Sequence, residues 1–224
     1  MTTNWGDGDQ PRLLIAIVAY QGVLADETDA FREVLQLLPG ARVVIAGAER
    51  GIVAGPGGAQ EVEATFDELD RAEVVVVPGG LGAHRHPEIA VWLRRIKPRF
   101  VLASSTGSAL LAASGLLKGR TAVTHWLAGP LLELHGVKVS KARLEVDEPY
   151  VTCSGLSSAF DAAFVVARAI GGPSLVREIR HELHLTAAPP LKAVPQQPTR
   201  ERGSTAPPPS MIEVELEQHK PRRR

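Results

Sequence analysis

The feature that most constrains the fold is the run at residues 73–77, a glutamate followed by four valines, which ends at Pro78-Gly79-Gly80. A short β-branched run that is apolar at successive positions is typical of a strand buried in the middle of a parallel sheet. Residues 100–103 have the same character and lead directly into Ser104-Ser105-Thr106-Gly107. Two such strands predict an α/β fold with helices on both faces of the sheet.

The rest of the chain alternates between short apolar runs and longer stretches with helical periodicity. We expect a small hairpin within residues 51–64 and further strands at residues 13–19, 42–46, 121–123, 137–139, 143–146 and 150–152. Helices are expected at residues 27–38, 87–96, 108–117, 127–134, 157–170 and 174–185. This alternation indicates βαβ units and a mainly parallel sheet.

Composition excludes several classes of protein. The formal net charge is zero, so nothing in the charge balance favours nucleic acid as a direct partner. The single cysteine, Cys153, excludes an internal disulfide framework and indicates a reducing compartment. No uninterrupted apolar run approaches the roughly 18–20 residues of a membrane span. The first ten residues are polar and partly acidic, unlike a signal peptide. We therefore expect a cytoplasmic protein.

The chain is expected to form one α/β domain, at residues 12–190 of the 224. Residues 1–11 are predicted to be disordered. Residues 191–224 are rich in proline and end in Lys220-Pro221-Arg222-Arg223-Arg224. Such a segment has too little apolar surface to offset its ordering entropy, so we predict a disordered basic tail.

Two predicted strand ends have unusual turn chemistry. In an open α/β sheet, ligands gather beyond the carboxyl ends of the strands. The glycines after Val77 let backbone amides approach a ligand closely. The turn after Ala103 has a hydroxyl, that of Ser105, at its apex, which is the arrangement of a nucleophile elbow. On this local pattern alone, ordinary Gly/Ser turns explain both segments equally well.

Several segments together resemble a known superfamily. Residues 105–126 read STGSALLAASGLLKGRTAVTHW, residues 77–80 read VPGG, residues 151–161 read VTCSGLSSAFD and residues 182–191 read ELHLTAAPPL. These segments resemble the elbow, glycine loop, following strand and closing helix of the ThiJ/PfpI (class I glutamine-amidotransferase-like) superfamily. The likeness is greatest to the branch of isonitrile hydratases and AraC-type regulator ligand domains. It implies a flavodoxin-like three-layer sandwich.

The resemblance also implies a set of site residues. Ser105 stands where the family carries its nucleophilic cysteine. The family's acid matches Glu27, because a second carboxylate, Glu33, follows six residues later; Asp26 is the competing register. The amides of Gly80 and Thr106 would form an oxyanion hole, and His125 is the nearest histidine. Glu27 as a helix N-terminal residue and His125 as a packing residue remain open alternatives.

Three further residues have weaker functional interpretations. Cys153 is either a displaced thiol nucleophile or, more often for such residues, a small buried hydrophobe. His84 and His86 either line a pocket mouth or lie in a solvated loop. The two histidines lack the neighbouring carboxylates or cysteines expected of a metal site. Residues 51–58 lack a nucleotide-binding motif. We expect neither metal nor cofactor.

Two functions follow from these residues. The first is an enzyme, a hydratase, hydrolase or lyase, that acts on a small carbonyl, amide or isonitrile-like compound through Ser105 and Glu27. The second is a non-catalytic ligand-binding or regulatory module, because a serine hydroxyl needs a base that a thiolate does not. In both cases the partner is a small molecule, and the resemblance implies a homodimer.

Overall fold

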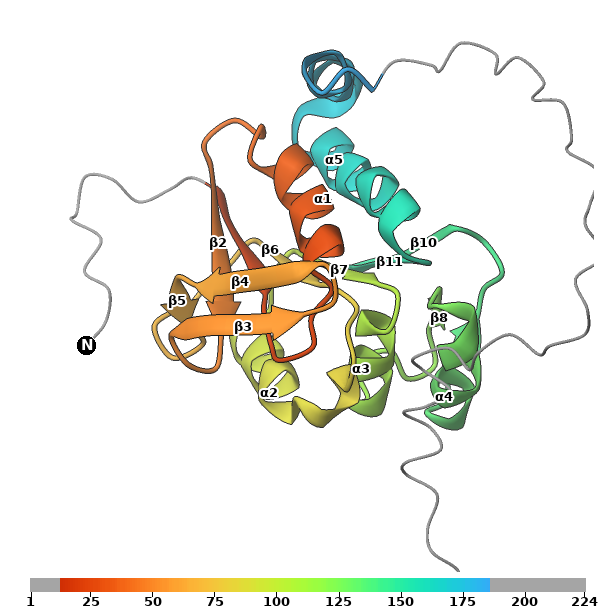
Figure 1. Cartoon of the computed structure of the whole chain (residues 1–224). Coiled ribbons are helices and arrows are strands. Elements are labelled where there is room, and N and C mark those ends of the chain that lie inside the picture. Colours follow the sequence, from red (N-terminus) through yellow and green to blue (C-terminus); the bar gives the residue numbers. More distant parts are fainter. Residues whose placement is uncertain (1–12, 186–224) are drawn as a thin grey trace, which may run out of the picture.

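The computed structural model describes residues 13–185 and is built on a seven-stranded sheet (Figure 1). Along the sheet the strands follow the order β10-β11-β7-β6-β1-β2-β5. Neighbouring strands are parallel except β10 and β11. Their bounds are β1 Leu13–Val18, β2 Ala41–Gly47, β5 Ala64–Thr65, β6 Val74–Val77, β7 Phe100–Ser104, β10 Leu144–Asp147 and β11 Tyr150–Cys153.

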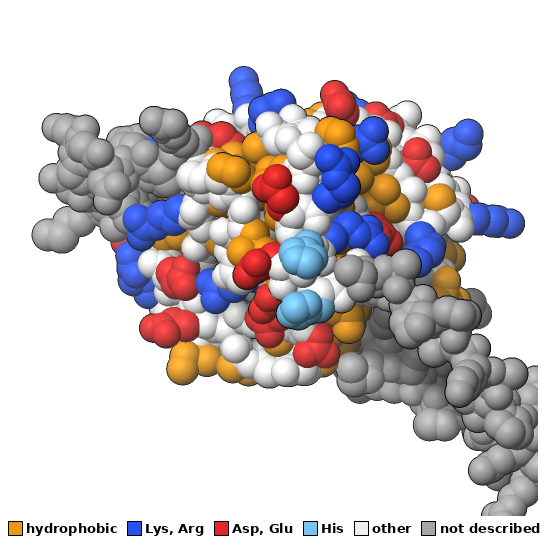
Figure 2. All heavy atoms as spheres, turned by 90° about the horizontal axis from the view of Figure 1, so that it is seen from above, with side chains coloured by type: hydrophobic (Ala, Val, Ile, Leu, Met, Phe, Trp, Pro, Cys, Tyr) orange, Lys and Arg blue, Asp and Glu red, His pale blue; other side chains and the backbone are white. Residues whose placement is uncertain are grey.

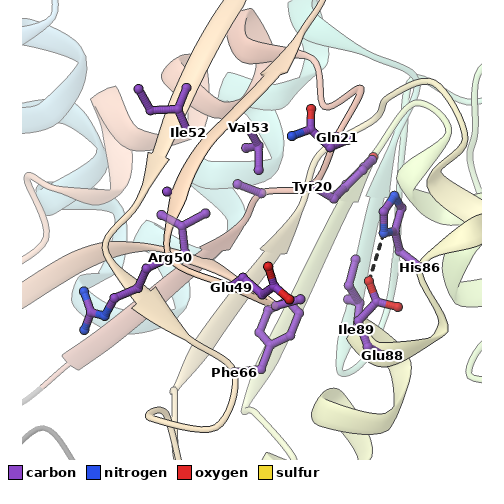
Figure 3. Close-up of a pocket in the computed structure, with 14 residues that line it drawn as sticks. Tyr20, Gln21, Glu49, Arg50, Ile52, Val53, Phe66, His86, Glu88 and Ile89 are labelled. Atoms are coloured by element: carbon purple, nitrogen blue, oxygen red, sulfur yellow. Dashed lines mark hydrogen bonds and ion pairs between the residues drawn. The ribbon is translucent and has the colours of Figure 1, made fainter.

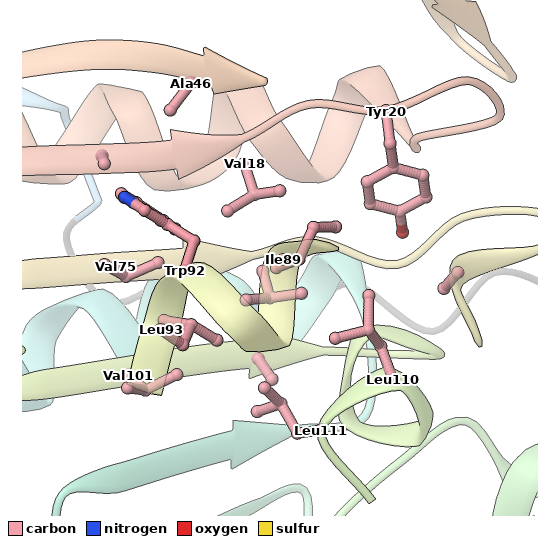
Figure 4. Packing of buried hydrophobic residues seen from close by; sticks show 14 of the residues in the cluster. Val18, Tyr20, Ala46, Val75, Ile89, Trp92, Leu93, Val101, Leu110 and Leu111 are labelled. Carbon is pink, nitrogen blue, oxygen red and sulfur yellow. The ribbon is translucent and has the colours of Figure 1, made fainter. Parts of the chain in front are cut away.

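Helices cover both faces of this sheet, so the predicted three-layer α/β fold is confirmed. Helices α1 (Ala25–Leu35) and α5 (Leu156–Glu182) pack together on one face, over one buried apolar cluster. Helices α2 (Pro87–Ile96) and α3 (Gly107–Ala113) lie on the other face, over a second cluster (Figure 4). The short helices η1 (Ala83–Arg85), η2 (Trp126–Ala128) and α4 (Gly129–Leu134) extend this second layer.

Two small sheets accompany the large one. The predicted hairpin is confirmed as β3 (Gly51–Gly55) and β4 (Gly58–Val62), which pair antiparallel. Strands β8 (Thr121–Ala122) and β9 (Lys138–Val139) form a short parallel pair. The hairpin lies beside the carboxyl end of β1, because Gly22 N–H donates to Ala54 O at 2.8 Å. It therefore borders the edge of the sheet where a site is expected.

Some element boundaries differ from those predicted. Helix α1 begins at Ala25, before residue 27, which places Glu27 in its first turn. Helix α3 ends at Ala113, four residues before the predicted end, because Gly115 has a positive φ of 73° that stops the helix. The two helices predicted at residues 157–170 and 174–185 are both present; they follow each other directly within α5, at a kink where Gly172 is non-helical before Pro173.

Helix α5 is also the one helix in residues 13–185 that is long and apolar enough to cross a membrane by length and composition. Its first half packs into the core, where six side chains are completely buried: Ser158, Ala159, Ala162, Ala163, Val166 and Ala167. A buried core helix meets the same criteria. The predicted disordered segments, 1–11 and 191–224, lie outside the described residues.

The face over α1 and α5 carries both signs of charge. Figure 2 shows acidic and basic side chains interspersed there rather than gathered by sign. One exposed pair joins Arg143 Nη2, just before β10, to Asp161 Oδ2 of α5 at 3.1 Å. This distribution agrees with the formal net charge of zero.

The buried core gives a direct test of the packing. Phe31 of α1 is 0% exposed beneath the helix, whereas Val91 of α2 is 64% exposed. We expect Phe31→Ala to lower the free energy of unfolding by about 3–5 kcal/mol, because it removes buried apolar atoms and leaves a cavity. The matched change Val91→Ala should alter it by less than about 0.5 kcal/mol. Equal effects in urea denaturation would contradict the assigned burial.

Candidate active site

Two loops meet at the carboxyl ends of β6 and β7. These strands are neighbours, with Val77 opposite Ala103, so the turns that follow them lie side by side. The start of α1 joins them, because Leu24 N–H donates to Gly79 O at 2.8 Å. Tyr20, after β1, also contacts this region and donates its hydroxyl proton to Pro78 O at 2.8 Å. Three segments distant in sequence thus form one small polar site.

Ser105 lies at a constrained turn. Its φ is +51°, in the left-handed region that residues other than glycine rarely adopt. Two contacts hold its backbone: Ser105 N–H donates to Cys153 O at 3.0 Å, and Thr124 Oγ1 donates to Ser105 O at 2.8 Å. The residue is 5% exposed, and no described residue forms a hydrogen bond with its hydroxyl. The elbow predicted from sequence is therefore present, with an unengaged hydroxyl at its apex.

The Glu27 carboxyl is buried beside this turn, at 3% exposure. Its Oε2 atom accepts hydrogen bonds from Gly79 N–H at 2.8 Å and from the Ser104 hydroxyl. Burial raises the pKa of Glu27 above 4.5, and these two hydrogen bonds oppose part of that rise. Because Oε2 already accepts two donors, Oε1 is the oxygen that can carry a proton.

Ser104 is a site residue that sequence reasoning missed. It is the last residue of β7, on the same face as Phe100 and Leu102, which lie in the cluster beneath α1. The two-residue periodicity of a strand was the available signal, because it directs residue 104 toward α1 and therefore toward Glu27.

Gly79 separates Ser105 from Glu27. A Cβ atom at this position would lie 3.0 Å from both Ser105 Oγ and Glu27 Oε2, and 2.7 Å from Ser105 Cβ. The hydroxyl and the carboxylate are therefore neighbours across the Gly79 Cα. They are not hydrogen-bonded to each other in the structure.

The expected oxyanion hole is only half available. Gly80 N–H donates to Thr106 Oγ1 at 2.8 Å, and the same hydroxyl donates back to Gly80 O at 2.8 Å. The Gly80 amide, predicted as one donor of the oxyanion hole, is therefore occupied by the Thr106 side chain in the structure. The backbone N–H of Thr106, at the N-cap of α3, makes no hydrogen bond to another described residue. It remains the available donor next to Ser105.

His125 follows Thr124 but does not contact the elbow through any described interaction. Its Nδ1 accepts from Leu127 N–H at 3.4 Å, and the centroids of its ring and the Trp126 ring are 5.7 Å apart. Burial lowers the pKa of His125, so its neutral form is favoured. Among the described side chains, Ser105 therefore has no histidine as a base.

Two other sequence interpretations are resolved by the structure. Burial raises the pKa of the Cys153 thiol to about 12, so it stays protonated and does not suit a displaced nucleophile. Asp26 is exposed and lies against the hairpin, where a Cβ at Gly57 would be 2.8 Å from its Oδ1. Glu27, rather than Asp26, therefore reaches the elbow. Glu33 is exposed on the outer side of α1.

The sequence also singles out His84 and His86 and predicts that no metal is bound. His86 lines a different cavity, and the side chain of His84 lies outside the described residues. Within residues 13–185, no group of three or more His, Cys, Asp or Glu side chains could hold a metal ion.

Comparison with known proteins agrees with this fold. The model of the DJ-1/PfpI family matches residues 15–169. A relative named isonitrile hydratase, from Pseudomonas putida, is 30% identical over 165 residues, covering 71% of this chain and 72% of that protein. The chain therefore belongs to the DJ-1/PfpI family.

Regulators are also among the relatives. The HTH-type transcriptional regulator CdhR of Pseudomonas aeruginosa is 26% identical over 140 residues, covering 60% of this chain but only 42% of the regulator. Among solved structures, a ThiJ/PfpI family protein from Pseudomonas syringae has a TM-score of 0.74 at 22% identity, covering 84% of each chain. An AraC family regulator from Pseudomonas putida has a TM-score of 0.68 at 13% identity, covering 76% of this chain and 99% of that one.

The close approach at Gly79 can be tested by one added methyl group. Gly79→Ala should lower the free energy of unfolding by about 1–3 kcal/mol, because its Cβ would collide with Ser105 and Glu27. The control Gly129→Ala adds a Cβ whose nearest neighbour is 3.9 Å away, in a helix, and should be neutral or stabilising. Equal destabilisation in chemical denaturation would contradict the described site.

The buried carboxyl gives a pH prediction. A folded-state pKa above 4.5 means that the neutral Glu27 stabilises the fold at low pH and that this contribution is lost as pH rises through the folded pKa. We therefore expect the parent to lose stability relative to Glu27→Gln as pH rises from about 4.5 toward 8. Urea denaturation across this pH range measures the free energy of unfolding of both proteins. A difference between them that does not change with pH would contradict the raised pKa of Glu27.

Proposed function

We propose that this protein catalyses the addition of water to a small electrophilic carbon, in a hydratase or hydrolase reaction. The observation that carries the proposal is the buried Glu27 carboxyl, with its raised pKa, across Gly79 from the unengaged hydroxyl of Ser105. A carboxyl group whose pKa moves toward neutrality can act as an acid and as a base in one cycle. The P. putida relative, named isonitrile hydratase, supports an isonitrile or similar compound as substrate.

Glu27, Ser105 and Thr106 have separate roles in this reaction. The Ser105 hydroxyl orients the attacking water and the Thr106 N–H stabilises the added oxygen. With an isonitrile, Glu27 Oε1–H protonates the terminal carbon while the water oxygen bonds to that carbon. One proton of the water passes to Glu27 and the other stays on the added oxygen. The adduct, R–N=CH–OH, then tautomerises to the formamide R–NH–CHO. No cofactor is consumed and Glu27 ends in its starting state.

Serine at the elbow acts differently from cysteine. A thiol at such a position ionises near neutral pH, whereas a hydroxyl attacks only with a base in contact. No such contact joins Ser105 to Glu27 or His125 among the described residues. We therefore assign Ser105 a water-orienting role rather than that of a covalent nucleophile.

The absence of a base on Ser105 also favours a second candidate, a ligand-binding or regulatory module without turnover. The similarity to CdhR and to an AraC family regulator supports it. In that case the same site would bind a small electrophilic or polar molecule, with Glu27 and Thr106 as hydrogen-bonding groups. Homodimerisation and a cytoplasmic location, which the sequence leads us to expect, remain predictions in both cases.

The experiment assays the parent, Ser105→Ala, Ser105→Cys and Glu27→Gln against isonitriles, reactive dicarbonyls and small esters. For an enzyme we expect turnover by the parent and a loss of about 10²-fold or more in kcat/KM in Glu27→Gln, because the proton-transfer group is removed. Ser105→Ala should lower kcat as well. The control Ser157→Ala, an exposed serine at the start of α5, should retain the parent rate.

Two outcomes would contradict the enzyme proposal. Turnover that survives in Glu27→Gln would exclude the carboxyl as the proton-transfer group. A silent parent together with an active Ser105→Cys would show an intact scaffold without natural turnover, and would favour the ligand-binding module.

A further inference from the structure

A cavity lies away from Ser105, between the carboxyl ends of β1 and β2, the hairpin strand β3 and the start of α2 (Figure 3). Its volume is about 230 Å³, below the roughly 300–1,000 Å³ typical of pockets for drug-sized molecules. Neither Ser105, Glu27 nor Gly79 lines it. The cavity is therefore separate from the candidate active site and suits a small ligand.

Three rings form part of its lining: Tyr20, Phe66 and His86. The rings of Tyr20 and His86 are in contact, with centroids 4.8 Å apart, and Phe66 stacks on Trp92 at 4.8 Å. Tyr20 is 4% exposed and Phe66 7%, so both are held in place by the core. Fixed aromatic faces bind apolar groups and attract cations through the negative face of the ring.

Two carboxylates line the same cavity, those of Glu49 and Glu88. Glu49 is exposed and forms no ion pair with another described residue. Glu88 Oε1 lies 2.9 Å from His86 Nδ1, a partner that is charged only when protonated. Glu49 therefore has no cationic partner among the described residues, and the partner of Glu88 is the imidazole of His86.

The one arginine in the lining, Arg50, does not offset them. Its Nε and Nη2 donate to the two carboxylate oxygens of Glu68 at 3.3 and 2.8 Å, and its Nη1 donates to Glu63 O at 2.6 Å. Figure 3 shows its guanidinium directed away from Tyr20 and His86. Arg50 is thus engaged outside the cavity, which leaves a negative interior.

We propose that this cavity binds a small organic ammonium ion, with its cationic group held by Glu49 and Glu88 and its apolar part against Tyr20 and Phe66. A metal ion fits less well, because no cluster of three or more metal-ligating side chains occurs among residues 13–185. An anion would meet two carboxylates, and the arginine that lines the cavity in the described part of the chain, Arg50, is already bound to Glu68 and Glu63. The proposal goes beyond the function assigned to Ser105 and does not depend on it.

The cavity shares one wall with the candidate active site. A Cβ at Gly80 would lie 2.8 Å from the Tyr20 hydroxyl oxygen, so the ring that lines the cavity contacts the glycine loop on its other side. A ligand against Tyr20 is therefore one side chain away from the loop that contacts Thr106.

The test uses the full chain and three probes of similar shape: benzylammonium, the neutral benzyl alcohol and the anion benzoate. Binding is followed by the amide shifts of the ¹⁵N-labelled protein. We expect benzylammonium to shift the amides of Tyr20, Glu49 and Phe66, benzyl alcohol to bind several-fold more weakly and benzoate not to bind. Glu49→Gln and Glu88→Gln should each weaken benzylammonium binding roughly threefold to tenfold.

Two controls make the test decisive. Glu133→Gln removes an exposed carboxylate on α4, outside the cavity, and should leave the affinity unchanged. Ser105→Ala should also bind normally, whatever becomes of the proposed activity. The proposal is overturned if benzylammonium does not bind below about 10 mM, or if the three probes bind equally. It also fails if Glu133→Gln weakens binding as much as Glu49→Gln, or if Ser105→Ala abolishes it.

Discussion

The arrangement of the site depends on the hydrogen bonds of one buried carboxyl group. Glu27, in the first turn of α1, accepts from Gly79 N–H after β6 and from the Ser104 hydroxyl at the end of β7. A buried polar group without partners destabilises the fold by several kcal/mol, so these contacts fix the start of α1 against both strand ends. Ser105 follows Ser104 directly, and its position beside the carboxyl results from the same contacts.

Serine at the elbow changes what this scaffold can do. The turn at Ser105 is rigid: its φ is positive, its N–H donates to Cys153 O, and its carbonyl accepts from the Thr124 hydroxyl. These features involve the backbone of Ser105 and do not depend on its side chain. A hydroxyl held there, without a base in contact, can orient water or a ligand more readily than it can attack. The proton chemistry therefore falls to Glu27, whose environment favours its neutral form.

The valine run of β6, together with the alternation of strands and helices, predicted the mainly parallel sheet, because continuous apolar residues suit a strand covered on both faces. The spacing from Glu27 to Glu33 selected Glu27 over Asp26, and in the structure Glu27 is the carboxyl that lies beside the elbow. Strand periodicity could place Ser104 on the face toward α1, but could not show its hydrogen bond to Glu27, 77 positions away in the chain. Nor could the sequence show that the Thr106 side chain occupies the Gly80 amide. Such contacts depend on strand register and on side-chain direction, which only the assembled fold determines.

The central claim is that the Glu27 carboxyl is neutral over a wider pH range than an exposed glutamate. The direct measurement is a ¹³C NMR titration of the glutamate carboxyl groups, in which the Glu27 resonance is identified by its absence from Glu27→Gln. We predict that this resonance titrates above pH 4.5. Titration at or below 4.5 would show a solvated or more strongly hydrogen-bonded carboxylate, and would contradict the proposed role of Glu27 as proton donor.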